Sequence, residues 1–188
     1  MKLLTPHPKK FTTESYHKMS ELGLFPEGDR LELIKGEIIE MSPVGWKHAS
    51  CVKRLNHLFM KKLGDQVIVG VQDPIQLDDN SEPQPDLVLL KPRSDFYGNE
   101  HPQPKDILLL IEVSDSSLEY DRTVKIPLYA ENQISEVWLV DLNESCLEIY
   151  RKPYQNYYQN TQKLSRINSI ILSNFPEFEF EIKISDLF

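Results

Sequence analysis

The chain has 188 residues, 40% of them hydrophobic and 27% charged, and a formal net charge of −8. This length can bury the core of one domain without cross-links, and this composition excludes global disorder. No apolar run reaches the roughly 18–20 residues that span a bilayer, and Pro6 and Pro8 interrupt the N-terminus before a signal-peptide core can form. We therefore predict a single cytoplasmic domain over residues 1–188 with no membrane partner.

The acidic balance bears on the partners of this protein. A protein that holds duplex DNA mainly through phosphate contacts usually carries a basic surface. Basic residues do cluster, as at Lys53-Arg54 and Lys61-Lys62, but such clusters are more often solvated faces than phosphate contacts. Binding to DNA would therefore require a local basic face or bound cations. Cys51 and Cys146 lie far apart without metal-ligand spacing, and we expect both to be reduced, packed thiols.

The first 41 residues predict a helix followed by a hairpin. Thr12 or Thr13 can cap a short helix that ends at Gly23. Residues 30–41 carry apolar side chains on both sides of Lys35-Gly36, where glycine can take a positive φ at little cost. This pattern predicts two short antiparallel strands.

A long helix and two strands are expected next. Apolar residues recur at helical spacing over residues 47–63, and Gly64 is the expected stop. Residues 66–77 are β-like, although Pro74 indicates a bulge or an edge strand. Residues 85–90 predict a further strand, which begins directly after a polar turn.

The most apolar segment, residues 107–113, predicts a central strand buried on both faces, because it lacks period-two alternation. A helix is expected over about residues 121–132, with Pro127 near its first turns. A second buried strand is expected over residues 137–141. Since a strand–helix–strand crossover connects these two strands, we expect them to pair in parallel.

The remaining segments complete the predicted fold. Residues 91–104 form a polar, proline-rich loop, and residues 147–150 a strand that follows a turn. Residues 153–188 predict a loop rich in Tyr, Asn and Gln, a strand near Ile170 and a closing segment. We therefore predict an α/β fold, a mixed central β-sheet flanked by α-helices.

Two carboxylates depart from this apolar pattern. Glu112 lies inside the most apolar strand, where an ionised carboxylate without a partner is very costly. Asp86 opens another strand directly after a proline. Two carboxylates that project from neighbouring strands into one cleft suit Mg²⁺ or Mn²⁺. The alternatives are that Glu112 pairs with a buried Lys or Arg, and that Asp86 simply ends a turn.

Lys125 lies on the predicted crossover helix after the Glu112 strand. That helix packs back against the sheet, so the long amine can reach the carboxylates. A metal ion, a positioned amine and a phosphate diester together make a phosphodiesterase, because both cations neutralise the charge that develops on phosphorus. The alternative is an ordinary surface ion pair between Asp121 and Lys125, four residues apart.

Several segments resemble the Uma-two family of endonucleases. The resemblance runs from about Phe11 to the C-terminus, and the order and spacing of its motifs are more specific than any one motif. The matching segments are RLELIKGEI at 30–38, QPDLV at 84–88, LIEVS at 110–114, YDRTVK at 120–125, LYA at 128–130 and EVWLVD at 136–141.

The resemblance implies membership of the PD-(D/E)xK nuclease superfamily and a restriction-endonuclease-like core. It implies that Asp86 and Glu112 bind the metal, and we include Val113 in the metal-binding set. The superfamily usually places its lysine two residues after the second acid, where this chain has Ser114. The family instead supplies the lysine from the following helix, which matches Lys125.

The resemblance also implies further site residues. Glu37, and less so Glu32, matches an acidic position of the N-terminal hairpin that orients water or a second metal; the alternative for both is a surface charge. His48 matches a histidine at the start of the long helix that either contacts phosphate or, as we slightly prefer, caps that helix. Asp121 is expected to hold Lys125 in place.

The leading hypothesis is a Mg²⁺-dependent endonuclease (Mn²⁺ as the alternative ion) that cleaves phosphodiester bonds in DNA as a homodimer. The second is a non-catalytic nucleic-acid-binding or regulatory module that keeps the fold. A hydrolase of another phosphate ester ranks last, because the 7 glycines are dispersed and form no phosphate-cradling loop. No added recognition domain is visible, so specificity would come from loops such as residues 91–104 or from the region of residues 154–158.

Overall fold

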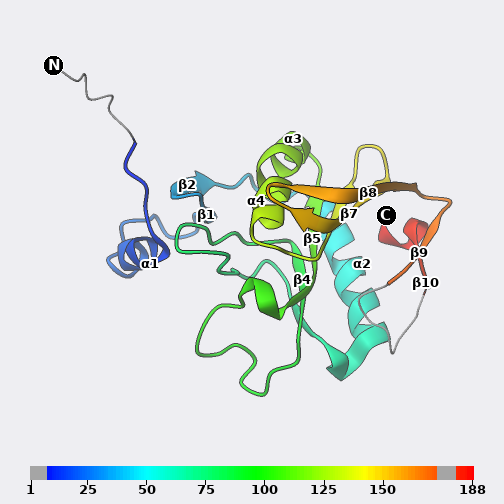
Figure 1. Cartoon of the computed structure of the whole chain (residues 1–188), viewed down its shortest axis with the longest axis horizontal. Coiled ribbons are helices and arrows are strands. Elements are labelled where there is room, and N and C mark those ends of the chain that lie inside the picture. Colours follow the sequence, from blue (N-terminus) through cyan, green and yellow to red (C-terminus); the bar gives the residue numbers. More distant parts are fainter. Residues whose placement is uncertain (1–7, 173–180) are drawn as a thin grey trace.

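The computed structural model describes residues 8–172 and 181–188 (Figure 1). Its centre is a six-stranded sheet in the order β3-β4-β5-β6-β7-β8. The strands of this sheet are β3 (Ile68–Gly70), β4 (Leu87–Leu90), β5 (Ile107–Ser114), β6 (Glu136–Asp141), β7 (Cys146–Tyr154) and β8 (Tyr157–Ser165). Within the described ranges, no helix has the length and apolarity that crossing a bilayer requires.

One parallel pair makes the sheet mixed. β5 and β6 run in parallel, with Glu112 opposite Leu139, and the other neighbouring strands are antiparallel. The predicted parallel crossover is therefore confirmed. β5 lies inside the sheet and is buried along almost its whole length, as its unbroken apolar sequence predicts.

Helices cover both faces of the sheet (Figure 1). The apolar face of α2 (Trp46–Leu63) packs on one face, where Phe59 meets Trp138 of β6. The other face is covered by a helical segment made of α3 (Leu118–Tyr120), η3 (Asp121–Lys125) and α4 (Ile126–Glu131). The predicted α/β fold with a mixed central sheet flanked by α-helices is confirmed.

The crossover helix differs from a regular α-helix. It begins three residues earlier than predicted, and η3 is a π-helical turn in which the Ile126 N–H bonds to the carbonyl of Asp121. Pro127 stands in the first turn of α4 rather than of the whole segment. π-Helical turns occur often at functional sites because they change where the following side chains point.

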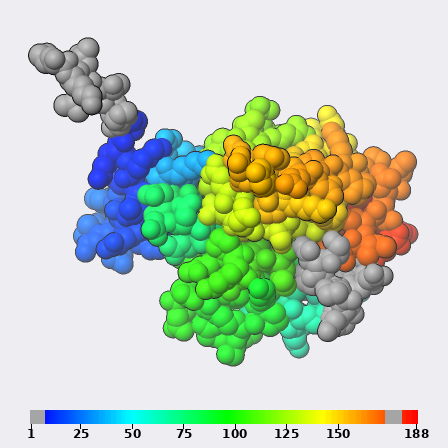
Figure 2. Space-filling model, viewed as in Figure 1, coloured from blue at the N-terminus to red at the C-terminus, as the bar shows by residue number. Residues whose placement is uncertain are grey.

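The N-terminal elements lie at one end of the molecule, opposite the C-terminal strands (Figure 2). Thr12 caps α1 (Thr13–Glu21), and Gly23 follows with a φ of 67°, as predicted. β1 (Leu31–Ile34) and β2 (Glu37–Glu40) form the predicted hairpin. Its two-residue turn at Lys35-Gly36 has φ values of 50° and 78°, the sign that a type I′ turn requires.

Two predictions of strand extent were wrong. Of residues 66–77, only β3 is a strand, because the chain leaves the sheet before Pro74 and takes a positive φ at Gln72. The start of the predicted loop after residue 153 instead contains β8, which pairs with β7 along its whole length. β8 is an edge strand that buries only Tyr158 and Leu164, so its polar sequence carries little strand signal.

The remaining elements are short. The strand expected near Ile170 is confirmed, and Cys51 and Cys146 are free, buried thiols, as expected. Residues 173–180 of the predicted closing segment lie outside the described residues. The additional strands and 3₁₀ turns are β9 (Ser169–Ile171), β10 (Glu181–Lys183), η1 (Gly64–Gln66), η2 (Pro104–Asp106) and η4 (Ile184–Leu187).

Candidate metal centre

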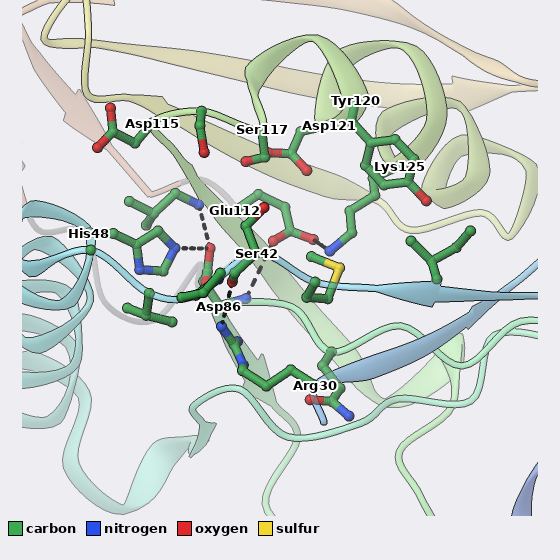
Figure 3. A pocket seen from close by; sticks show the side chains of 18 of the residues that line it. Arg30, Ser42, His48, Asp86, Glu112, Asp115, Ser117, Tyr120, Asp121 and Lys125 are labelled. Carbon is green, nitrogen blue, oxygen red and sulfur yellow. Dashed lines mark hydrogen bonds and ion pairs between the residues drawn. The ribbon is translucent and has the colours of Figure 1, made fainter. Parts of the chain in front are cut away.

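A cleft of about 410 Å³ opens between the start of α2, the end of β5 and the segment that begins with α3. Figure 3 shows the side chains that line it. The sequence-predicted residues that line it are Asp86, Glu112, Val113, Lys125, His48 and Asp121. Helix α2, the residue before β4, strand β5 and the crossover segment thus bring residues from positions 48 to 125 to one place.

Asp86 lies directly before β4 and is held in a fixed orientation. Its Oδ2 accepts hydrogen bonds from the Val113 backbone N–H at 2.9 Å and from His48 Nε2 at 3.0 Å, and its Oδ1 accepts one from the Gln72 amide at 3.1 Å. Burial raises the pKa of Asp86, but these hydrogen bonds outweigh burial and hold the pKa below its ordinary value. Asp86 is therefore ionised at neutral pH.

Glu112 is buried on the face of β5 that meets the crossover segment. Its Oε1 accepts from Lys125 Nζ at 3.2 Å and from the Tyr129 hydroxyl, and its Oε2 lies 3.4 Å from the Asp86 backbone N. Burial raises the pKa of Glu112 to about 8, although the charge of Lys125 opposes this rise. A second cation beside Glu112 would favour its ionised form.

Lys125 is buried between two carboxylates. Its Nζ lies 3.0 Å from Glu32 Oε1 and 3.2 Å from Glu112 Oε1. Burial lowers the pKa of Lys125, but the negative charges of Glu112, Glu32 and Asp121 outweigh burial and raise it above its ordinary value. The amine is therefore a permanent positive charge at the back wall of the cleft.

The donor atoms fit a hard divalent cation. Asp86 and Glu112 supply carboxylate oxygens at the same cleft. The Val113 N–H points at Asp86, and the N–H and C=O of one strand residue point to the same side, so the Val113 carbonyl faces Asp86 as well. Carboxylate and carbonyl oxygens are the ligands that Mg²⁺ and Mn²⁺ prefer.

Of the two hairpin glutamates, the one expected to be the weaker candidate lies near the cleft, and the stronger candidate does not. Glu32, expected as the weaker candidate, is buried, and its Oε1 accepts from Lys125 Nζ and from the Gln84 N–H at 2.8 Å. Glu37, the stronger candidate, is exposed and pairs with Lys10 at 2.6 Å, outside the cleft. The hairpin therefore brings Glu32, and not Glu37, to Lys125.

Two further expectations change. His48 does not cap α2, whose N-cap is Gly45; from the first turn of that helix its imidazole contacts Asp86 instead. Asp121 accepts hydrogen bonds from Ser114 at 2.6 Å and Ser117 at 2.7 Å. Asp121 therefore acts on Lys125 through its charge, while Ser114 and Ser117 hold its carboxylate in place.

Gln72 and Tyr129 were not predicted as site residues. Gln72 lies in an irregular segment after β3 and reaches Asp86 because of its positive φ of 57°. Tyr129 lies four residues after Lys125, on the same helical face. That spacing was a usable signal for Tyr129, whereas nothing in the pattern around Gln72 indicates its role.

The fold is shared with a protein of known structure. The whole architecture is similar to that of a solved structure titled "Crystal structure of a putative nuclease belonging to DUF820 from Anabaena variabilis ATCC 29413". The TM-score is 0.70 and the sequence identity 18%, over 95% of this chain and 97% of that chain. At this identity the similarity shows a shared fold alone.

Sequence comparison is more specific. Residues 13–185 match the Uma2 family, which is described as "Putative restriction endonuclease". The chain therefore belongs to the Uma2 family, as its motifs predicted. The chain matches none of the curated proteins with which it was compared.

Proposed function

We propose that this protein is a metal-dependent endonuclease that hydrolyses phosphodiester bonds in DNA. The observation that carries the proposal is the convergence of Asp86, Glu112 and Lys125 on one open cleft. Membership of the Uma2 family agrees with it. The same three residues were singled out from the sequence because neighbouring strands were expected to project both acids into one cleft and the crossover helix was expected to bring the lysine to it.

Each residue has a defined role in this proposal. Asp86 and Glu112, with the carbonyl of Val113, hold Mg²⁺ or Mn²⁺. When bound, the ion supplies an activated water and neutralises charge on the phosphate. Lys125 places a positive charge beside Glu112 and stabilises the negative charge that the phosphate gains in the transition state. His48 fixes the orientation of Asp86.

The net charge of −8 constrains how DNA is bound. Among the described residues that line the cleft, Arg30 and Lys125 are cationic, whereas Glu40, Asp86, Glu112, Asp115 and Asp121 are acidic. A phosphate therefore meets a net negative cleft in the metal-free protein. Divalent cations reverse that balance, so we expect DNA binding at the cleft to require the metal.

Cleavage of supercoiled plasmid by the purified chain tests the proposal. Reactions with Mg²⁺, with Mn²⁺ and with EDTA are run beside Glu112→Gln and the matched control Glu144→Gln, which alters an exposed carboxylate outside the cleft. We expect metal-dependent nicking by the wild type and the control, and at least a ~100-fold loss in Glu112→Gln. Equal cleavage by Glu112→Gln would show that the assigned site is wrong.

The oligomeric state decides the products. One chain carries one such cleft among its described residues, so a single copy would nick one strand, whereas the homodimer expected from the family would cut both. Plasmid that becomes linear without a long-lived nicked form, together with a dimeric mass in light scattering, would support the dimer.

A non-catalytic binding module is the alternative, since Lys125 also serves as a buried ion-pair partner. Calorimetric titration with Mn²⁺ separates the two functions. The nuclease requires binding of Mn²⁺ by the wild type and its loss in Asp86→Asn. A folded wild type that binds DNA but neither Mn²⁺ nor Mg²⁺ would favour the binding module.

A further inference from the structure

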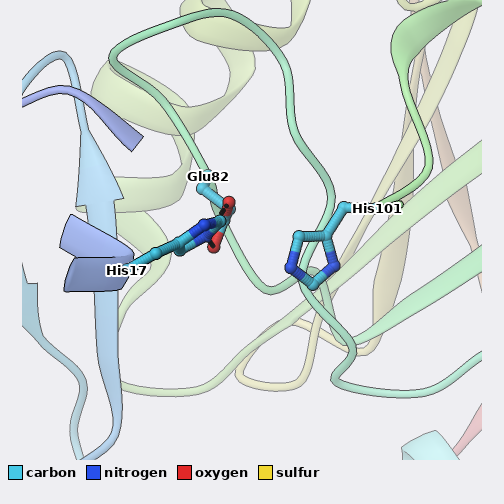
Figure 4. A group of neighbouring side chains, drawn as sticks. All are labelled: His17, Glu82 and His101. Atoms are coloured by element: carbon cyan, nitrogen blue, oxygen red, sulfur yellow. Dashed lines mark hydrogen bonds and ion pairs between the residues drawn. The ribbon is translucent and has the colours of Figure 1, made fainter. Parts of the chain in front are cut away.

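A second group of metal-ligating side chains lies outside the cleft. His17 of α1, Glu82 of the segment before β4 and His101 of the loop at residues 91–104 come from three separate parts of the chain and gather at one point (Figure 4). One ligand atom of each lies within 4.8 Å of the other two. None of the three lines the cleft that contains Asp86 and Glu112.

The donor set differs from that of the cleft. Two imidazole nitrogens and one carboxylate oxygen are typical zinc ligands, and three protein ligands leave a fourth position for water. Imidazole also binds Zn²⁺ much better than it binds Mg²⁺. We propose that His17, Glu82 and His101 form a Zn²⁺-binding site, distinct from the all-oxygen centre of the cleft.

The geometry requires only small movements. His17 Nε2 lies 2.7 Å from Glu82 Oε2, whereas two ligands of a tetrahedral zinc ion lie about 3.4 Å apart, given Zn–N and Zn–O bonds of about 2.1 Å. This contact must open by under 1 Å, and the longest separation in the group must close from 4.8 Å or less.

Burial and exposure agree with an ion that enters from solvent. The Glu82 side chain is 4% exposed, so its carboxylate lies at the base of the site, and the His17 side chain is 42% exposed. The His17 and His101 rings meet edge-on, with centroids 5.7 Å apart. Zinc binding would replace the direct contact between His17 and Glu82 by a shared ion.

A second group of possible ligands, Asp141, Glu144 and Cys146, is a weaker candidate. Arg122 lies 3.3 Å from Asp141, and Lys163 lies 2.6 Å from Glu144. These cations already neutralise the two carboxylates and would repel a metal ion. Among the described residues, Glu82 instead forms an ion pair with His17, which is itself one of the proposed ligands.

The proposed ion would stiffen the hairpin that supplies Glu32. Glu82 exchanges two backbone hydrogen bonds with Leu33, at 2.7 and 3.3 Å. Two residues later, the Gln84 N–H donates to Glu32 Oε1. A zinc ion would tie α1 and the loop at residues 91–104 to this connection, so we expect Zn²⁺ to raise the thermal stability of the whole chain.

Calorimetric titration of the full chain with Zn²⁺, in excess Mg²⁺ to occupy the cleft, tests the site, with thermal melts run in parallel. His101→Phe keeps the aromatic contact with His17 but removes a ligand, and His17→Gln keeps a hydrogen-bond donor for Glu82. The matched control is His57→Phe, which changes an exposed histidine of α2.

We expect the wild type and His57→Phe to bind one equivalent of Zn²⁺ and to melt several degrees higher in its presence. In His101→Phe and His17→Gln, the affinity for Zn²⁺ should fall at least tenfold, and the rise in melting temperature should shrink or vanish. The proposal is overturned if the wild type binds no Zn²⁺ under these conditions, or if His101→Phe binds it as tightly as His57→Phe. Because the readouts are binding and melting, the result does not depend on nuclease activity.

Discussion

Lys125 Nζ lies 3.2 Å from Glu112 Oε1, although the two residues are thirteen positions apart and on different elements. The contact crosses from the π-helical turn η3 to the buried strand β5. Residue 114, two positions after Glu112, is the serine that anchors Asp121. The positive charge of the site therefore comes from the helix that covers the sheet, and not from the strand that carries the second acid.

This arrangement predicts that a lysine at position 114 can replace Lys125 in cleavage. Val113 faces the α2 side of the sheet, so the Ser114 side chain points to the same side as Glu112, where the Lys125 amine lies. Lys125→Ala should reduce cleavage at least ~100-fold, and the double variant Ser114→Lys/Lys125→Ala should recover at least tenfold of that loss. Rates of plasmid nicking measure both.

A matched control is Ser117→Lys/Lys125→Ala, which introduces a lysine at the other serine that contacts Asp121. It lies on the loop rather than on β5, and we expect no recovery from it. Equal recovery by both double variants would mean that any added positive charge suffices, and that the position of the amine is unimportant.

The two hairpin glutamates give the second prediction. Glu32→Gln removes one of the two carboxylates that pair with Lys125, whereas Glu37→Gln removes an exposed partner of Lys10. Breaking one side of a buried ion pair costs about 3–5 kcal/mol, and exposed pairs contribute at most about 1 kcal/mol. We expect urea unfolding to show a larger loss of unfolding free energy in Glu32→Gln than in Glu37→Gln, by that difference. Cleavage should fall only in Glu32→Gln. Loss of cleavage in Glu37→Gln alone would restore the role that the family resemblance assigned to it.

The sequence predicts a site residue when the burial of that residue follows from its own strand, and not when the burial depends on contacts between distant segments. Glu112 was recognisable because a carboxylate inside an eight-residue buried strand requires a partner, and Asp86 because it directly precedes the neighbouring strand. The choice between Glu32 and Glu37 was not recognisable in this way. Both belong to the same short hairpin, and only its docking against residue 82 buries one of them.

The errors in the fold have the same origin. The strands that bury both faces, β4, β5 and β6, were predicted from their apolar runs. β8 was missed because tertiary pairing with β7, rather than its own composition, holds this polar edge strand in place. The π-helical turn was also unpredictable, since its sequence is compatible with a regular α-helix.

Trp46 gives the third prediction. It is 79% exposed at the first position of α2, next to Gly45, which lines the cleft. If the protein cleaves DNA, this ring can stack on a base beside the cleft, and such stacking contributes about 1–3 kcal/mol. Trp46→Ala should therefore raise the Kd for a short DNA, measured with Ca²⁺ in place of Mg²⁺, roughly fivefold or more.

Phe96→Ala is the comparison, because Phe96 is 74% exposed on the loop at residues 91–104, which the sequence indicated as a source of specificity. That residue lines a separate hollow and not the cleft. A larger loss of DNA affinity in Phe96→Ala than in Trp46→Ala would indicate that DNA binds to this loop rather than to the start of α2.

The last prediction concerns acid stability and a cluster outside the cleft. Glu148 of β7 accepts hydrogen bonds from Arg122 and Tyr150, and although burial raises its pKa, these contacts hold that pKa below its ordinary value of 4.5. A carboxyl group whose pKa is lower in the folded than in the unfolded state stabilises the fold above the unfolded pKa. That stability is lost as the pH falls from about 4.5 through the folded pKa. Glu148→Gln should therefore lower the Tm near pH 7 by about 2–4 °C for each kcal/mol lost.

Thermal melts of the wild type and Glu148→Gln between about pH 3 and pH 7 measure this effect. The difference in Tm should be constant above about pH 5 and should shrink towards zero at the acidic end, because both side chains are then uncharged. Glu144→Gln is the control: its exposed pair with Lys163 should change the Tm little at any pH. A Tm difference for Glu148→Gln that persists unchanged at pH 3 would assign its effect to packing or to neutral hydrogen bonds rather than to the charge that faces Arg122.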